Sequence, residues 1–408
     1  MNVCIPIKLM PAHGKGGMQD HALQLAQGLV RRGCRVTVLT TAHPDGITRE
    51  EVDGVTVRYL EGTPPAQYSP EWWRESARAL RAIAAQDKLD VVHIQSLAGH
   101  SLLAGGVLAE LGIPSVVSFH GTCVDEIRTA RLLLRKCARR PADIREQLAR
   151  IFHFRIMHRK LALPTVALAG AVIATSNEQV EILRRHHHCP AEKIRVVYNG
   201  IDLALFPGGL ADVPAPPRNG RATVLAVARM LEEKGIQYLL RALPAIARIG
   251  DVRATIVGDG PYRDRLEREA RELHLGSAVE FTGAVSLESL PQRYQAADVF
   301  VNPTLRINGY DLTILQAMAC SKPVVVSRLG SVPTAVVHEE EGLLVRPGDV
   351  RELSDAVAVL LSDKRLRLQM GENARRKVER DFGLEKMIDD TLGVYRSVLK
   401  DRGAKRAG

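Results

Sequence analysis

Short runs of aliphatic residues alternate with longer amphipathic stretches along the first half of the chain. Residues 3–7 and 35–39 are predicted strands, because they are short and rich in β-branched side chains. Between them, apolar residues recur at helical spacing from Ala22 to Val30, and Gly33 ends that predicted helix. Further strands are predicted at residues 55–60, 91–94, 115–119, 171–175 and 195–198. Strands that alternate with helices imply βαβ units and a parallel sheet.

The pattern changes between residues 202 and 222, where proline and glycine are frequent and no periodicity is present, so we predict a linker. A second alternating series follows, with strands predicted at 223–227, 254–257, 279–281, 299–301, 324–326 and 343–345. The chain is therefore predicted to be α/β, with two Rossmann-like, doubly wound parallel-sheet domains at residues 1–203 and 204–408. We also expect a last helix, about residues 384–400, to pack back on the first domain.

One basic segment interrupts the alternation. Residues 124–160 contain eleven Lys and Arg against four acidic residues, a net charge of +7. Leucine, isoleucine and phenylalanine accompany these charges at helical spacing. Two interpretations stand: a solvated helical pair that covers the first domain, or a basic amphipathic surface that contacts anionic lipid or a phosphorylated acceptor.

Composition narrows the class of protein. The 408 residues, 46% hydrophobic and 25% charged, are ordinary for a globular protein of two domains. A net charge of +10 favours anionic partners such as nucleotides, phosphorylated acceptors or an anionic membrane surface. The aromatic content of 4% offers few stacking platforms, and no nucleic-acid module is recognised, so we expect no nucleic-acid partner.

The shortness of the hydrophobic runs and the scattered cysteines favour a cytoplasmic location. No run reaches the roughly 18 apolar residues of a membrane-spanning helix, and the first residues do not have the pattern of a signal peptide. Six cysteines are scattered without a CxxC pair, which is typical of reduced thiols. We expect a cytoplasmic protein that can lie peripherally on the inner face of the membrane. The consecutive His186, His187 and His188 point in different directions on a helix, so we expect no metal site there.

The strongest chemical signal is the pair Arg229 and Lys234, in the loop between the predicted strand 223–227 and the next helix. Open α/β sheets bind ligands at the carboxyl ends of their strands. A guanidinium and an ammonium group five residues apart can both reach one diphosphate. The glycine turn at 258–261 follows the next strand, and it lets the backbone approach a ligand or the neighbouring domain closely.

A third element runs from the predicted strand 299–301 into a helix that begins near Asp311. Asp311 is placed to cap this helix or to complement its dipole. Asn308 lies in the loop before it. Gln316 is a polar residue in an apolar helical stretch, so it needs a partner, and a bound ribose would supply one.

Together these segments resemble glycosyltransferase family 4, the large retaining family with the GT-B fold. The similarity covers nearly the whole chain. In the first half it rests on residues 16–21, 119–122, 174–176 and 197–202. In the second half it rests on residues 229–235, 257–261, 281–283, 297–299, 316–319, 322–325 and 341–345. No single motif is decisive, but their order and spacing are specific.

The resemblance implies a role for each domain and for particular residues. The first domain would bind the acceptor, and the second a nucleotide-diphosphate sugar, with the reaction in the cleft between them. His120 would bond a hydroxyl of the donor sugar, with a buried structural histidine as the alternative, while Arg229 and Lys234 would neutralise the diphosphate without a metal. The implied catalytic residues are His120, Asn308, Arg229 and Lys234. The implied donor-binding residues are Gly16, Gly17, Arg229, Lys234, Asn308, Gly309, Tyr310, Asp311, Leu312 and Gln316, and the acceptor-binding residues are His21 and Arg128.

The chain departs from the family at its acidic residues. The family carries two glutamates eight residues apart in the third element, and Asn308 and Gln316 stand at those positions. Gln316 can still bond a ribose hydroxyl, whereas Asn308 can bond a sugar hydroxyl but cannot act as a carboxylate. Thr334 stands where the family has a glutamate after Pro333. A front-side transfer, in which the leaving phosphate oxygen takes the acceptor proton, needs no protein carboxylate and fits these changes.

The sequence therefore predicts a retaining hexosyltransferase that moves a sugar from a nucleotide-diphosphate sugar to a hydroxyl acceptor. We expect a UDP-sugar rather than a GDP-sugar, no cofactor or metal, and an acceptor that is lipid-linked or phosphorylated. Cell-surface glycan, glycolipid or specialised glycoside biosynthesis is the expected setting. Two alternatives stay open: a catalytically silent relative that binds a nucleotide sugar or glycan, and another GT-B enzyme such as a sugar-nucleotide epimerase or a sugar phosphorylase.

Overall fold

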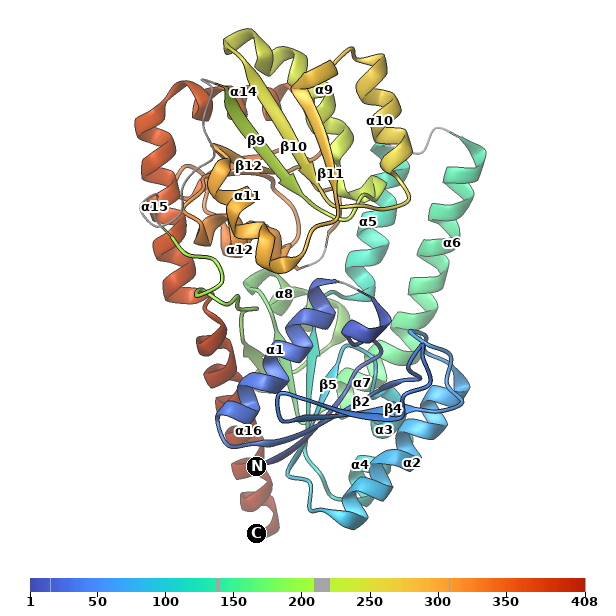
Figure 1. Ribbon diagram of the computed structural model, residues 1–408. Coiled ribbons are helices and arrows are strands. Elements are labelled where there is room, and N and C mark those ends of the chain that lie inside the picture. Colours follow the sequence, from blue (N-terminus) through green and yellow to red (C-terminus); the bar gives the residue numbers. More distant parts are fainter. Residues whose placement is uncertain (15, 137–139, 209–220, 308, 408) are drawn as a thin grey trace. The chain divides into compact units, whose positions relative to one another are not determined.

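The computed structural model describes residues 1–14, 16–136, 140–208, 221–307 and 309–407. The chain forms two compact units, and Figure 1 shows that each is a sheet covered by helices. The first unit comprises Met1–Ile127, Arg150–Gly200 and Leu384–Gly408, and the second comprises Arg128–Ala149 and Ile201–Gly383. The predicted fold class, two doubly wound α/β domains, is confirmed.

An eight-stranded sheet forms the first unit, in the order β3-β4-β2-β1-β5-β6-β7-β8. Its strands are β1 (Asn2–Pro6), β2 (Arg35–Thr41), β3 (Arg49–Val52), β4 (Val55–Leu60), β5 (Val91–Gln95), β6 (Ser115–Phe119), β7 (Ala171–Ala174) and β8 (Ile194–Val196). All neighbours pair in parallel except β3 and β4, which form an antiparallel pair at the edge. Because β1 lies between β2 and β5, its carboxyl end is the topological switch point, where doubly wound sheets bind ligands.

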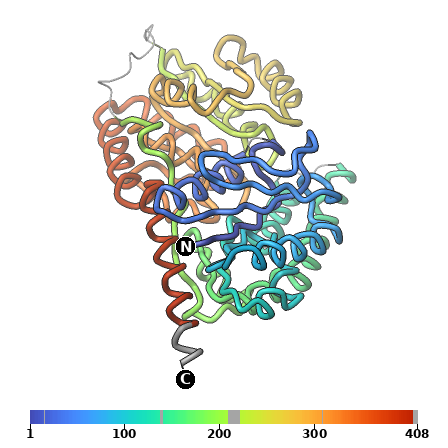
Figure 2. The backbone as a smooth tube through the Cα atoms, turned by 60° about the horizontal axis from the view of Figure 1, so that its bottom comes forward, coloured from blue at the N-terminus to red at the C-terminus, as the bar shows by residue number. Residues whose placement is uncertain are grey.

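The helices of the first unit include one from the far end of the chain. They are α1 (Gly17–Arg31), α2 (Pro70–Gln86), α3 (His100–Ala104), α4 (Val107–Glu110), α7 (Leu163–Leu168), α8 (Asn177–His187) and α16 (Leu384–Ala407). α16 packs against α1 and β6, and Figure 2 shows the N-terminus beside it. A Cβ on Gly28 of α1 would lie 2.0 Å from Cδ1 of Ile388, and Arg32 pairs with Glu385 and Asp389. The C-terminal helix is thus part of the core of this unit.

The described part of the basic segment 124–160 is mostly helical, and it is divided between the two units. Its elements are α5 (Cys123–Lys136), α6 (Pro141–Met157) and a π-helical turn at His158–Ala162. The stretch Arg128–Ala149 clusters with the second unit, because Leu133 belongs to the hydrophobic core of that unit. The expected boundary placed the whole segment within residues 1–203, and the structure divides it differently.

A six-stranded, fully parallel sheet forms the second unit, in the order β11-β10-β9-β12-β13-β14. Its strands are β9 (Ala222–Val227), β10 (Val252–Val257), β11 (Val279–Gly283), β12 (Val299–Asn302), β13 (Val324–Ser327) and β14 (Gly342–Val345). Its main helices are α9 (Ile236–Ile246), α10 (Arg263–Glu272), α11 (Leu290–Ala296), α12 (Leu312–Ala319), α13 (Val332–Ala335), α14 (Val350–Ser362) and α15 (Lys364–Asp381). The chain order reverses between β9 and β12, so the switch point of this sheet lies at their carboxyl ends.

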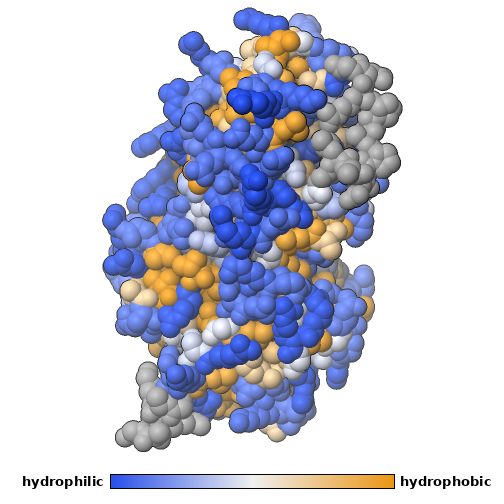
Figure 3. All heavy atoms as spheres, turned by 90° about the vertical axis from the view of Figure 1, so that its left-hand side faces the viewer, coloured by the Kyte–Doolittle hydropathy of each residue, from blue (hydrophilic) through white to orange (hydrophobic). Residues whose placement is uncertain are grey.

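Part of the predicted linker, residues 209–220, lies outside the described residues. The residues before it are fixed to the second unit: Arg375 of α15 donates to the carbonyl of Phe206 at 2.7 Å. In the described part of the chain, no helix combines the length and the hydropathy needed to span a membrane. On the face that Figure 3 shows, hydrophobic residues form separate patches among hydrophilic ones.

Candidate functional site

Two loops meet at the switch point of the second unit, one after β9 and one after β12. The amide of Leu305 donates to the carbonyl of Glu233 at 2.7 Å, and the hydroxyl of Thr304 donates to the same oxygen at 3.2 Å. Gly235 has a positive φ of 74°, and a Cβ there would lie 1.9 Å from the carbonyl oxygen of Pro303. The loops can approach this closely only because position 235 is glycine.

Lys234 and Asp311 join these loops through an ion pair, with 2.6 Å between Nζ and Oδ1. The amide nitrogen of Asn302 donates to the other carboxylate oxygen at 3.0 Å. Burial by itself would raise the pKa of Asp311, but Lys234 and Asn302 together hold that pKa below its ordinary value. Asp311 is the N-cap residue of α12, yet its side chain makes no capping hydrogen bond. The expectation that this side chain caps the helix is therefore wrong, because it is engaged by Lys234 and Asn302.

Arg229 is the exposed cation of the same site. Its side chain makes no hydrogen bond or ion pair with any residue that the structure describes. The backbone beside it is held firmly: the amide of Met230 donates to the carbonyl of Asp259 at 2.8 Å, and the amide of Tyr262 donates to that of Met230 at 3.0 Å. A Cβ on Gly260 would lie 2.5 Å from the Met230 carbonyl oxygen. The predicted glycine turn thus supports the loop that presents the Arg229 guanidinium group.

Gln316 is buried in α12, and its partner within the protein is a tyrosine that the sequence did not point to. The hydroxyl of Tyr294, on α11, lies 2.9 Å from Oε1 of Gln316 and 3.2 Å from the carbonyl oxygen of Thr313. Burial places the pKa of Tyr294 well above its ordinary value, so its hydroxyl is a donor. The expectation that Gln316 depends on a ribose for its partner is therefore corrected: Tyr294 already supplies one.

The remaining predicted donor residues follow in the same loop. Asn308 lies outside the described residues. Tyr310 is buried, and its ring packs edge-on against Phe382 with 5.6 Å between the ring centroids. Gly309 precedes it, and Leu312 begins α12. Tyr310 therefore holds the loop against the core.

A neighbouring stretch of α5 supports the start of this loop. The amide of Ile307 donates to the hydroxyl of Thr129 at 2.8 Å, and that hydroxyl lies 3.3 Å from the Ile307 carbonyl oxygen. Arg128, predicted to bind the acceptor, is exposed next to Thr129 and belongs to the second unit. His21, the other residue predicted to bind the acceptor, belongs to the first unit.

In the first unit, histidines cluster around the carboxyl end of β6, two strands along the sheet from β1. The ring of His21, on α1, meets the ring of His120 edge-on with 4.5 Å between centroids. Nε2 of His120 lies 2.7 Å from Oε1 of Gln95. Because an amide oxygen can only accept, Nε2 carries the proton and donates, so Nδ1 of neutral His120 is the acceptor. Gly16 and Gly17 begin α1 in the same unit.

The histidine cluster is held neutral. Burial lowers the pKa of His120 to about 4, although a hydrogen bond with Asn199 opposes the shift. Burial, with His120 nearby, also lowers the pKa of His93 to about 3. His93 contacts the hydroxyls of Ser118 at 2.7 Å and of Tyr395, on α16, at 2.6 Å. Near pH 7 the cluster therefore offers hydrogen bonds and no positive charge.

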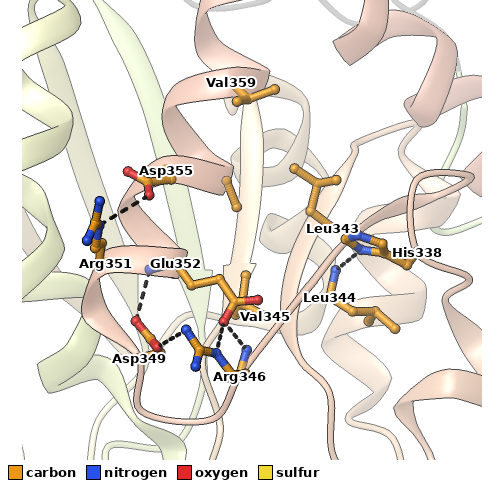
Figure 4. A pocket seen from close by; sticks show the side chains of 11 residues that line it. His338, Leu343, Leu344, Val345, Arg346, Asp349, Arg351, Glu352, Asp355 and Val359 are labelled. Carbon is orange, nitrogen blue, oxygen red and sulfur yellow. Dashed lines mark hydrogen bonds and ion pairs between the residues drawn. The ribbon is translucent and has the colours of Figure 1, made fainter.

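A depression between β14 and α14 is a different kind of surface. Figure 4 shows that Arg346 points toward Asp349 and Glu352, with ion pairs of 2.7 Å to each. His338 accepts a hydrogen bond from the amide of Leu344 at 3.0 Å. The polar groups that line this depression form hydrogen bonds and ion pairs with one another, so their arrangement is explained by the structure of the protein itself.

Comparison with known proteins matches both halves of the chain to glycosyltransferase families. Residues 15–205 match the family described as Glycosyltransferase Family 4, and residues 212–377 match Glycosyl transferases group 1. The D-inositol 3-phosphate glycosyltransferase of Kineococcus radiotolerans is 30% identical over 96% of this chain and 92% of its own. An uncharacterized glycosyltransferase of Methanocaldococcus jannaschii is 27% identical over 95% of this chain and 96% of its own.

A solved structure supports the fold in the same way. Anabaena HepE in complex with UDP and glucose has a TM-score of 0.73 and 19% identity, over 97% of this chain and 100% of its own. At this identity the similarity establishes the architecture that the two proteins share.

Proposed function

This chain belongs to glycosyltransferase family 4, as its motifs indicated, and we propose that it moves a hexose from a nucleotide-diphosphate sugar to a hydroxyl acceptor with retention of configuration. The observation that carries the proposal is the pair of cations at the switch point of the second unit. Arg229 is exposed beside a firmly held backbone, and Lys234 is held by Asp311. A diphosphate is the ligand that such a guanidinium and ammonium pair would bind.

The two cations have different tasks. Arg229 has no partner among the described residues, so the planar guanidinium group is available to donate to two phosphate oxygens at once. Lys234 is oriented by Asp311, and it can turn from that carboxylate toward a phosphate or bridge both groups. As the bond between sugar and phosphate breaks, negative charge grows on the leaving diphosphate, and both cations stabilise it more strongly than in the ground state.

The reaction itself needs no carboxylate from the protein. The acceptor oxygen attacks the anomeric carbon on the face from which the diphosphate leaves, and the leaving phosphate oxygen takes the acceptor proton. His120 supplies a neutral imidazole that bonds a hydroxyl of the donor sugar. Gln316 contributes its amide to the ribose while Tyr294 holds its oxygen. A contribution of Asn308 to the sugar remains a prediction, as does binding of the acceptor by His21 and Arg128.

For the substrates, we propose a UDP-sugar donor and an acceptor that is lipid-linked or phosphorylated. The net charge of +10 supports an anionic acceptor. We place the enzyme in the cytoplasm, at the inner face of the membrane, in the synthesis of a surface glycan, glycolipid or specialised glycoside.

The test is a thermal-shift panel of UDP-, GDP- and ADP-sugars, followed by donor turnover with the best binder in the presence and absence of EDTA. We expect one nucleotide sugar to raise the melting temperature and to be consumed at the same rate with EDTA. Tight binding without transfer or donor hydrolysis, over a panel of hydroxyl acceptors, would instead establish a silent binding protein. Consumption that requires inorganic phosphate would establish a phosphorylase.

A further inference from the structure

The outer face of α6 carries a row of apolar side chains that are open to solvent. Ile144, Leu148, Phe152 and Ile156 are exposed by 42%, 54%, 67% and 39% respectively. Residues four apart on a helix lie on one side of it, one above the other, so these four form a continuous stripe. We call these four residues the outer stripe.

The outer stripe is separate from the side of α6 that faces the protein. Gln147 is buried, and Phe154 and Met157 pack against the hydrophobic core of the first unit. Arg150 pairs with Glu126 on this inner side. The helix therefore has two apolar faces, and the fold of this chain uses one of them. A surface helix normally places charged residues on its outer face.

Basic residues flank the outer stripe. Arg145, Arg155, Arg159 and Lys160 are exposed, and none of them pairs with an acidic residue in the described part of the chain. At about 100° per residue, Arg145 and Arg155 fall between members of the stripe around the helix, and Arg159 and Lys160 follow in the π-helical turn. Glu146 is the one exposed acidic residue on α6. The face thus alternates apolar side chains with guanidinium groups.

We propose that the outer face of α6 docks on the surface of an anionic lipid membrane. The helix would lie in the plane of the interface, with the outer stripe among the upper acyl chains and the guanidinium groups at lipid phosphates. The basic residues beside the outer stripe favour an anionic membrane over a second copy of the chain as the partner. Two copies of α6 that met through their outer stripes would bring arginine against arginine. This docking rests on the membrane location proposed above and not on the sugar transfer, because it concerns binding alone.

The experiment is flotation of the purified full-length protein with vesicles of phosphatidylcholine, with and without phosphatidylglycerol. We expect binding that depends on phosphatidylglycerol and weakens as salt is added. Leu148→Ser with Phe152→Ser should reduce the bound fraction roughly tenfold or more, because two large apolar side chains no longer enter the lipid. Arg145→Glu with Arg155→Glu should abolish the dependence on anionic lipid.

Matched controls come from exposed positions on other helices. Val359→Ser with Leu368→Ser removes two side chains of similar exposure, 49% and 44%, and should leave binding unchanged. Arg268→Glu with Arg271→Glu on α10 changes the net charge equally and should keep most of the binding. Equal losses in the controls and in the α6 variants would overturn the proposal. So would the absence of binding to anionic vesicles, or a dimer that the Leu148 and Phe152 substitutions dissociate.

Discussion

Arg229 is proposed to act in catalysis and to contribute little to stability, and Arg229→Ala tests both statements. The side chain is exposed and has no partner among the described residues, so its removal should change the free energy of unfolding by no more than about 0.5 kcal/mol. For a unit of this size that is a change of about 2 °C or less in melting temperature. Two unit charges about 4 Å apart interact by about 4 kcal/mol at an effective dielectric constant of about 20. Because each 1.4 kcal/mol or so is tenfold, we expect kcat/KM to fall by about 10² to 10³.

The assay is release of nucleoside diphosphate from the best donor, with thermal unfolding measured on the same samples. Arg229→Lys should fall between the wild type and Arg229→Ala, because it keeps the charge and loses the planar fork. Arg365→Ala is the control, since Arg365 is also exposed and without a described partner in the second unit. Activity within a few-fold of wild type for Arg229→Ala would refute the assigned diphosphate site, and a large loss of stability would refute the description of Arg229 as a free side chain.

Lys234→Met should lower the free energy of unfolding, measured by urea titration, by about 2 kcal/mol, since it leaves Asp311 mostly buried without its cation. Adding Asp311→Leu should restore part of that loss. Because the pKa of Asp311 is lowered in the folded state, the wild-type contribution is present above pH about 4 and is lost as pH falls through the lowered pKa. An effect that does not weaken at all as the pH is lowered below about 4 would contradict this. Gly235→Ala should weaken donor binding and destabilise the second unit, whereas Gly393→Ala, where a Cβ has nothing within 4 Å, should be neutral or stabilising by calorimetry. Because the pKa of His120 is lowered to about 4, the folded state loses stability relative to the unfolded state as pH falls from about 6.5 to 4. His120→Gln should remove on the order of 3 kcal/mol of that pH dependence. An unchanged profile of unfolding free energy against pH would argue against a buried neutral His120.

Much of the fold follows from the sequence for a simple reason. Strands of a parallel sheet covered on both faces are short continuous apolar runs, and such runs are visible in the order of the residues. Ligand sites of these sheets lie at the carboxyl ends of the strands, so loop polar residues next to those ends are visible too. That reasoning placed Arg229 and Lys234 after a predicted strand, and the structure has them beyond β9, at the switch point of the second sheet. His120 was indicated by the family resemblance, and it lies beyond β6.

The partners of these residues could not be predicted from the sequence. Asp311 follows Lys234 by 77 positions, and only the meeting of two loops makes it a counter-ion and not a helix cap. Tyr294 reaches Gln316 from a different helix, and no local pattern marks a tyrosine as a hydrogen-bond donor to a particular amide. The stretch Arg128–Ala149 shows helical periodicity, but periodicity reveals that a face is buried and not which sheet buries it.

The place of α16 in the first unit has a consequence for how the chain is made. The chain passes between the two units after Ile127, Ala149, Gly200 and Gly383, so no single cut separates them. A ribosome delivers all eight strands of the first sheet before residue 197, yet Ile388 and Tyr395, which complete its core, are synthesised only after the second unit. The second unit, whose last element ends at Asp381, can therefore finish folding before α16 is available to the first unit. Until α16 packs against α1, a groove along α1 stays open. A fragment ending near residue 203 would keep that groove open permanently.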